Sequence, residues 1–140
     1  MPDWKIFAIG SALFAGLTAV LAKVGVKDIP SNLATLIRTI VILVFLCLLV
    51  GMRHEWKAPW LLDKRCLVFL ILSGITTGLS WLCYYRALQG GPASIVAPID
   101  KMSLAVAILL SVAFLGEHLN IFQWLGAGLI VAGTFIVILK

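Results

Sequence analysis

Residues 32–51 read NLATLIRTIVILVFLCLLVG and contain a single charged residue, Arg38. A helix of about 20 mostly apolar residues spans a hydrocarbon core about 30 Å thick. Four other stretches have the same length and character, so the sequence predicts an all-α integral membrane protein with five transmembrane helices. The predicted helices cover residues 4–24, 32–51, 67–88, 95–115 and 121–139.

The composition agrees with this fold class. Hydrophobic residues make up 62% of the 140 residues, charged residues only 12%, and the mean hydropathy is +1.12. Soluble domains have about 45–50% apolar and about 25% charged residues. A soluble domain and a disordered chain are therefore both excluded. Strands of a membrane barrel would show about 10 alternating residues, which these long apolar runs do not.

Short connections join the predicted helices, so we expect a single domain over residues 1–140. The expected location is the cell (plasma or inner) membrane. Five spans place the two termini on opposite sides. The N-terminal side collects Lys5, Arg53, Lys57, Lys64 and Arg65, and the other side collects Lys23, Lys27, Lys140 and, at the edge, Arg86. This weak asymmetry permits either an N-terminus inside the cell or insertion in both orientations.

The net charge of +5 does not indicate nucleic acid, because the basic residues are scattered between apolar runs. Membrane lipids are the expected partners of these residues. Trp56 and Trp60 are expected at the headgroup level. Ser31 or Asn32 is expected to cap the second helix and Asn120 the fifth.

Ionisable residues inside the spans are costly and are therefore candidates for function. Arg38 lies two turns inside the second helix, and Asp100 and Lys101 lie inside the fourth. These three residues predict a functional site or a buried ion pair. Lys23 and Arg86 lie at helix ends, where anchoring at the interface is the simpler interpretation.

Polar residues form one stripe on each of the third and fourth helices. Their helical spacing predicts a bundle interior or a water-filled pathway, although hydrogen bonding between helices explains any single hydroxyl. The stripes contain Ser73, Thr77, Ser80 and Tyr84, with Trp81 beside them, and Asp100, Ser103, Ala107 and Ser111.

Pro98 and the pair Gly90 and Gly91 predict a pliable or broken entry to the fourth helix, which is one way in which carriers build a site. Glu117, just beyond that helix, is predicted to be structural. Small residues form faces that allow close helix packing, within a chain or between chains. These are the GxxxG from Gly74 to Gly78 and a face with Gly126, Gly128, Ala132 and Gly133.

No HExxH, GxSxG, P-loop or dinucleotide motif is present, so we predict no catalytic residues and no enzymatic activity. Cys47, Cys66 and Cys83 lack the spacing of metal ligands. No metal and no cofactor are expected.

Three segments carry a resemblance to a known family: ALQGGPASIVAP (87–98), LGEHL (115–119) and QWLG (123–126), closing on Gly133. Together with Lys23 and Arg38, they resemble the EamA domain of the drug/metabolite transporter superfamily over essentially the whole chain. The superfamily typically has two such five-helix repeats in opposite orientation and moves small solutes by alternating access. The present chain is similar to the short single-repeat bacterial and archaeal members.

The resemblance implies one repeat of a ten-helix inverted-repeat transporter that needs a partner, expected to be an antiparallel homodimer. The expected function is a secondary carrier or exporter of a small metabolite or drug-like solute. Tyr84, Trp81, Asp100 and Lys101 would line or support its pathway, with Asp100 as the candidate for proton coupling.

Two alternatives stay open: an accessory or assembly subunit that does not transport, and a flippase for lipid-linked sugars. The small multidrug exporters are a weaker analogy, because they depend on a carboxylate in the first helix and the first predicted helix here has none.

Overall fold

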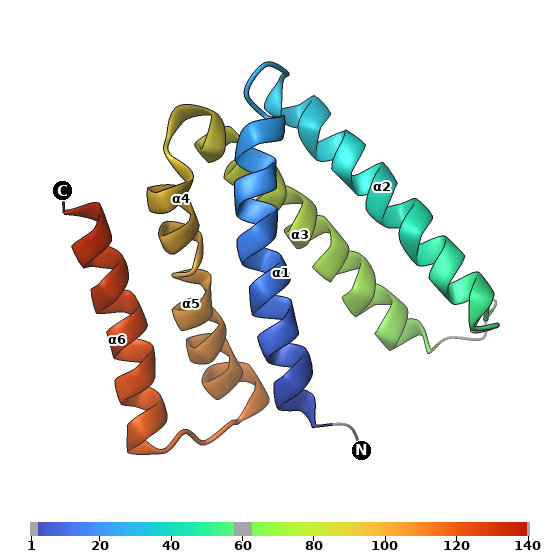
Figure 1. The fold of residues 1–140 in the computed structure, drawn as a ribbon. Coiled ribbons are helices and arrows are strands. Elements are labelled where there is room, and N and C mark those ends of the chain that lie inside the picture. The colour runs from blue at the N-terminus through green and yellow to red at the C-terminus, as the bar shows by residue number, and fades with distance from the viewer. Residues whose placement is uncertain (1–2, 58–62, 140) are drawn as a thin grey trace. The chain divides into compact units, whose positions relative to one another are not determined.

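The structure is a computed structural model that describes residues 3–57 and 63–139, so Trp60 and Lys140 lie outside the described residues. Its elements are all helices (Figure 1). In chain order they are α1 (Trp4–Gly25), α2 (Ser31–Met52), α3 (Lys64–Gly90), α4 (Ala93–Asp100), α5 (Ser103–Leu110), the π-helix η2 (Ser111–Leu115) and α6 (Ile121–Ile138).

Five helical segments are long and apolar enough to cross a membrane, which confirms the predicted fold class. Four of them are α1, α2, α3 and α6, and the fifth is the interrupted segment Ala93–Leu115. Helix α3 begins at Lys64, three residues before its predicted start. The prediction followed hydropathy alone, whereas lysine and arginine are good helix formers that suit a helix end at the headgroup level.

The chain divides into two compact units, which we describe separately. Unit 1 contains residues 1–21 and 91–140, and unit 2 contains residues 22–90. In unit 1, both α4 and α5 pack against α6. In unit 2, α2 packs along α3. That residues 1–140 form a single domain stays a prediction.

The fourth span is interrupted, whereas the sequence predicted one continuous helix over residues 95–115. Helix α4 ends at Asp100, and α5 begins at Ser103. The Lys101 N–H donates to the carbonyls of Ala97 (3.2 Å) and Pro98 (3.0 Å). The Met102 N–H donates to the carbonyl of Ile99 (3.0 Å). Bonds between residues three apart mark a tightened turn.

The sequence predicted a pliable or broken entry to this helix, but the interruption follows Pro98 and lies at residues 101–102. Pro98 lies inside α4. Because proline has no N–H, α4 loses one of its few internal hydrogen bonds. At the other end of the span, Gly116 has a φ of 67° as it ends η2, a left-handed conformation that glycine adopts without strain.

The two predicted caps had different outcomes. Asn120 caps α6 as predicted: its Oδ1 accepts from the Gln123 N–H (2.9 Å), and its own N–H donates to Gln123 Oε1 (2.7 Å). The prediction for α2 was wrong, because Pro30 is the N-cap residue and no side chain caps the helix. The carbonyl of Pro30 accepts the first helical hydrogen bond, from the Ala34 N–H (3.0 Å), so Ser31 is already inside the helix.

Most large apolar side chains of the spans are exposed. In the most apolar part of each span, no more than 11% of the residues are buried among the described ones. Val26 and Leu88 are the largest side chains that are fully buried. An apolar surface of this extent is stable only against lipid or against another polypeptide.

The Asn120 cap yields a prediction for stability. Asn120→Ala removes the side-chain half of the capping box, so the free energy of unfolding should fall by about 1 kcal/mol. Unfolding by a denaturing detergent in mixed micelles measures this difference.

Asn32→Ala is the matched control, because Asn32 is exposed in the first turn of α2 and caps nothing. It should change stability by less than about 0.5 kcal/mol. Equal losses in the two variants would contradict the role of the Asn120 cap.

Candidate functional site

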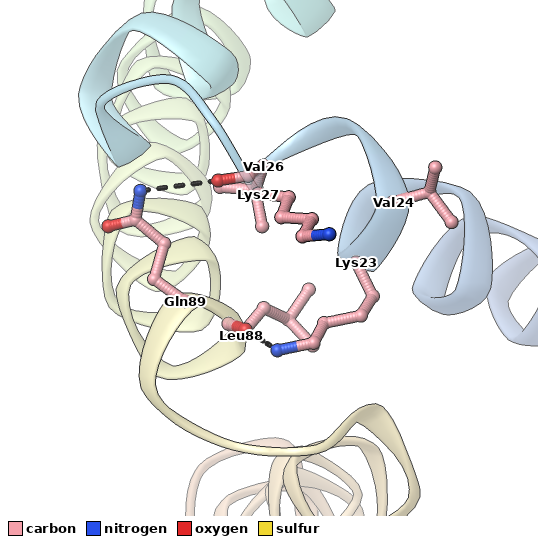
Figure 2. A pocket seen from close by; sticks show the side chains of 6 residues that line it. All are labelled: Lys23, Val24, Val26, Lys27, Leu88 and Gln89. Atoms are coloured by element: carbon pink, nitrogen blue, oxygen red, sulfur yellow. Dashed lines mark hydrogen bonds between the residues drawn. The ribbon is translucent and has the colours of Figure 1, made fainter.

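In unit 2, a side chain of α1 binds a backbone carbonyl near the end of α3, and a side chain of α3 binds carbonyls in the loop after α1. Lys23 Nζ donates to the carbonyl of Leu88 (2.5 Å). Gln89 Nε2 donates to the carbonyls of Ile29 (2.7 Å) and Val26 (3.4 Å). Figure 2 shows the Lys23–Leu88 and Gln89–Val26 bonds on two sides of a cavity. These bonds fix the end of α1 and the loop after it to the end of α3.

The cavity has a volume of about 440 Å³ and two lysines in its lining. Its remaining lining is mostly apolar, and the full set is Lys23, Val24, Val26, Lys27, Leu88 and Gln89. The sequence predicted Lys23 only as an interface anchor and missed Gln89. None of these three bonds has a local sequence signal, because each joins residues at least 60 positions apart.

Arg38 stacks on aromatic rings of α3 in the same unit. Its guanidinium carbon lies 4.2 Å from the centre of the Trp81 ring and 5.7 Å from that of Tyr85. Tyr85 is buried, with 5% of its surface exposed, and its ring meets that of Tyr84 edge-on at 6.3 Å. The structure thus brings the predicted residues Arg38, Trp81 and Tyr84 together around Tyr85.

Sequence reasoning missed Tyr85, although a signal was available. Tyr85 follows Trp81 by four residues, which places both on one face of α3. An arginine at the centre of a membrane span costs about 2.5–3.5 kcal/mol on insertion scales. A desolvated cation–π contact returns about 2 kcal/mol. Arg38 lies short of the centre of its span and is half-buried, so both figures are upper values, and the two rings offset part of its cost.

In unit 1, Asp100 and Lys101 form an ion pair at the break in the fourth span. Lys101 Nζ lies 3.4 Å from Asp100 Oδ2. On a continuous helix, neighbouring side chains point about 100° apart, which disfavours such a pair. The long, flexible lysine side chain nevertheless reaches the carboxylate of its neighbour at the end of α4. Their side chains stay 34% (Asp100) and 49% (Lys101) exposed, so the pair is accessible from outside unit 1.

Thr134 joins α6 to the break and was not predicted. Its Oγ1 donates to the carbonyl of Ile130 on its own helix (2.9 Å) and to that of Pro98 (3.4 Å). Thr134 is 5% exposed and is the buried residue of α6. The sequence could have singled out Thr134, because it is the only hydroxyl-bearing residue in the sequence of α6.

The other predicted site residues are spread over both units. Thr77 is exposed and donates to the carbonyl of Ser73 on its own helix (2.8 Å). Ser80 and Ser103 are exposed. Their predicted place along a substrate pathway stays a prediction.

The remaining predicted structural positions lie at helix ends. Gly90 is the last residue of α3, and Gly91 follows it. Glu117 is exposed in the loop before α6, and its N–H donates to the carbonyl of Ser111 (3.4 Å) at the end of η2. The backbone of Glu117 therefore takes part in ending the fourth span.

The predicted small-residue faces stay open. A Cβ atom added at Gly74, Gly78, Gly126 or Gly128 would meet no atom within 4 Å in the described part of the chain. In unit 1, an apolar groove of about 390 Å³ lies between α5 and α6, with Ala132 in its lining. These faces do not serve close packing between the described helices.

Within the described ranges 3–57 and 63–139, no group of three His, Cys, Asp or Glu residues could hold a metal ion. The groups that the spans do place together are one stacked guanidinium and one carboxylate–ammonium pair. Such groups bind charged or polar solutes and exchange protons.

The bond from Thr134 to the break can be tested by Thr134→Val. Loss of this hydrogen bond should lower the free energy of unfolding by about 0.6–1.7 kcal/mol and should speed amide exchange around the turn after α4. Unfolding in mixed micelles and hydrogen–deuterium exchange measure the two effects.

Thr76→Val is the control, because Thr76 is exposed and its hydroxyl bonds only to carbonyls of its own helix. It should leave exchange around the turn after α4 unchanged. If the two variants have the same effect there, Thr134 does not hold the break.

Comparison with known proteins identifies the family. The model of the EamA-like transporter family matches residues 3–139. A protein named as an uncharacterized transporter in the cobO 3' region of Sinorhizobium sp is 48% identical over 135 residues, which are 96% of each chain. An uncharacterized protein of Methanocaldococcus jannaschii is 30% identical over 90% of this chain and 89% of its own.

A longer relative matches with part of its length. The uncharacterized transporter YwfM of Bacillus subtilis is 28% identical over 94% of this chain but only 44% of its own. No solved structure matches the chain. The family model and the relatives confirm the predicted resemblance, and the five spans confirm a multi-pass protein of the cell membrane. The chain belongs to the EamA-like transporter family.

Proposed function

We propose that the chain is the subunit of a secondary carrier in which two copies, inserted in opposite orientations, move a small solute by alternating access. The observation that carries this proposal is the interrupted fourth span with the Asp100–Lys101 pair at its break. Carriers commonly place their sites at broken helices, because the freed backbone groups and nearby charges bind solutes and coupling ions.

Asp100 is the residue proposed to couple transport to protons. Its carboxylate is paired with an ammonium group on one side and is partly exposed on the other. A carboxylate in this position can exchange Lys101 for a proton when its surroundings change. Ionisable groups that carry out such exchanges in membranes are the usual components of proton relays.

Three observations support a second copy. The apolar faces of the spans are exposed, and the small-residue faces meet no neighbour among the described residues. The relative YwfM is more than twice as long as its aligned part, which leaves room in it for a second unit of this size. Finally, an odd number of spans and a small charge bias allow opposite insertion of two copies.

The coupling role predicts a loss of proton movement in Asp100→Asn. Proteoliposomes that contain a trapped pH indicator would be mixed with a panel of small metabolites. Wild-type protein should change the internal pH with at least one of them, and Asp100→Asn should reduce the signal to that of empty vesicles.

Glu117→Gln is the matched control, because it also removes one carboxylate, but from an exposed loop. It should retain the wild-type signal. Unchanged proton movement in Asp100→Asn would exclude Asp100 as the coupling residue.

Opposite insertion predicts that a single loop is labelled from both sides of the membrane. Cys47, Cys66 and Cys83 would first be replaced by serine, because all three are exposed and free. Single cysteines at Asp28 and His118 then mark loops that the five spans place on opposite sides. In intact cells, a membrane-impermeant maleimide should label about half of each population, since a bias this weak sets no single orientation.

If one of the two positions is labelled almost completely and the other not at all, the copies are inserted in one orientation. That result would exclude the antiparallel pair. Glu55→Cys is a useful third position, because it lies in an exposed loop on the side of His118 and should behave like it.

A further inference from the structure

We infer that Arg38, held on the ring of Trp81, is a binding site for an anionic group, a carboxylate or a phosphate. If the chain is the carrier proposed above, this site defines its substrate class. Only the claim that the ligand is transported rests on that proposal. The site itself stands on the geometry and charge of unit 2.

Arg38 is held away from the membrane interface. It lies seven residues after the start of α2, which is about 10 Å along the helix. The bond from Gln89 to the Ile29 carbonyl shows that this end of α2 lies beside the end of α3. Counted from Gly90, Tyr85 is about 8 Å and Trp81 about 14 Å deep along α3.

The guanidinium lies closer to the deeper ring than to the shallower one, at 4.2 Å from Trp81 and 5.7 Å from Tyr85. A long basic side chain that only avoids hydrocarbon extends toward the headgroups. Arg38 instead extends to Trp81. Its position is therefore not explained by anchoring at the interface.

Stacking leaves the hydrogen-bond donors of Arg38 available. A guanidinium has five N–H groups, and the cation–π contact with Trp81 is an attraction of its charge to the ring that requires no conventional hydrogen bond. Within residues 3–57 and 63–139, Arg38 contacts the two rings and forms no ion pair. A guanidinium can bind a carboxylate or a phosphate through two parallel N–H donors.

No carboxylate of the same two helices can neutralise Arg38. The sequences of α2 and α3 contain no aspartate or glutamate. Residues 22–90 hold eight of the eleven basic and three of the six acidic residues, and unit 1 holds three of each. The net charge of +5 therefore lies entirely in unit 2, and unit 1 is neutral.

The cavity at the end of α3 adds to the positive potential. Lys23 and Lys27 both line it (Figure 2). They lie at the end of unit 2 where α2 begins, and Arg38 is about 10 Å along α2 from that end. Charges of one sign in surroundings of low dielectric constant concentrate ions of the other sign. An anion approaching from this end would meet the two lysines before it reaches Arg38.

Binding can be measured without any transport assay. Trp81 would be kept as the only tryptophan by replacing Trp4, Trp56, Trp60 and Trp124 with phenylalanine. The protein in nanodiscs of phosphatidylcholine is then titrated with phenyl phosphate, with benzoate and with the cation benzylamine. The fluorescence of Trp81 reports on groups that bind the guanidinium stacked on it.

Both anions should give saturable changes, and benzylamine should give none. Arg38→Gln should weaken anion binding by about tenfold or more, because hydrogen bonds to charged groups are strong. Arg38→Lys should have an intermediate effect, because it keeps the charge but loses the planar donors. The control Arg86→Gln removes the same charge from an exposed site near the end of α3 and should bind normally.

A second set of nanodiscs, made with phosphatidylglycerol, separates the two sources of the anion. A spectral change there that needs Arg38, with no response to the soluble anions in phosphatidylcholine, would assign the site to a lipid phosphate. Equal responses of Arg38→Gln and the parent protein to every anion would overturn the inference. Because no flux is measured, this result does not depend on whether the chain is a carrier.

Discussion

The cost of placing charge in hydrocarbon is the constraint on which the rest of this structure depends. Three ionisable residues lie away from the ends of the spans, and they are stabilised in two ways. Arg38 contacts the ring of Trp81, whereas Asp100 and Lys101 pair with each other at the break in the fourth span. The buried hydroxyl of Thr134 lies 3.4 Å from the carbonyl of Pro98, in the last turn before that break. The ring of Trp81 and the ion pair at the break therefore each offset part of the same cost.

The fold was largely predictable from sequence, because membrane spans depend on length and hydropathy, and both are local properties. The five spans and the Asn120 cap were predicted correctly. Predictions failed where structure depends on contacts distant in sequence or on detailed backbone bonding. Hydropathy could not reveal the turn at Lys101, the bond from Lys23 to Leu88 or the bond from Thr134 to Pro98. For the candidate site, the sequence identified the charged residues but not their partners.

The exposed apolar surface connects the fold to the proposed assembly. Helices that bury so little against one another are stable in lipid, where each satisfies its own backbone. The open faces at Gly74, Gly78 and Gly128 allow close approach of another helix. The two units also differ in charge, since unit 2 carries the whole net charge and unit 1 is neutral. An inverted second copy would bring another pair of such units into the same membrane.

The central claim is that two inverted copies complete each other, and the masses of two tandem fusions test it most directly. Five spans place the end of one copy on the side where an inverted copy begins, so a direct fusion forces opposite orientations. One additional transmembrane helix in the linker forces equal orientations. In nanodiscs, the direct fusion should stay a single polypeptide of ten helices, while the fusion with the additional helix should assemble further. The account would be contradicted if the direct fusion assembled further while the fusion with the additional helix stayed a single polypeptide.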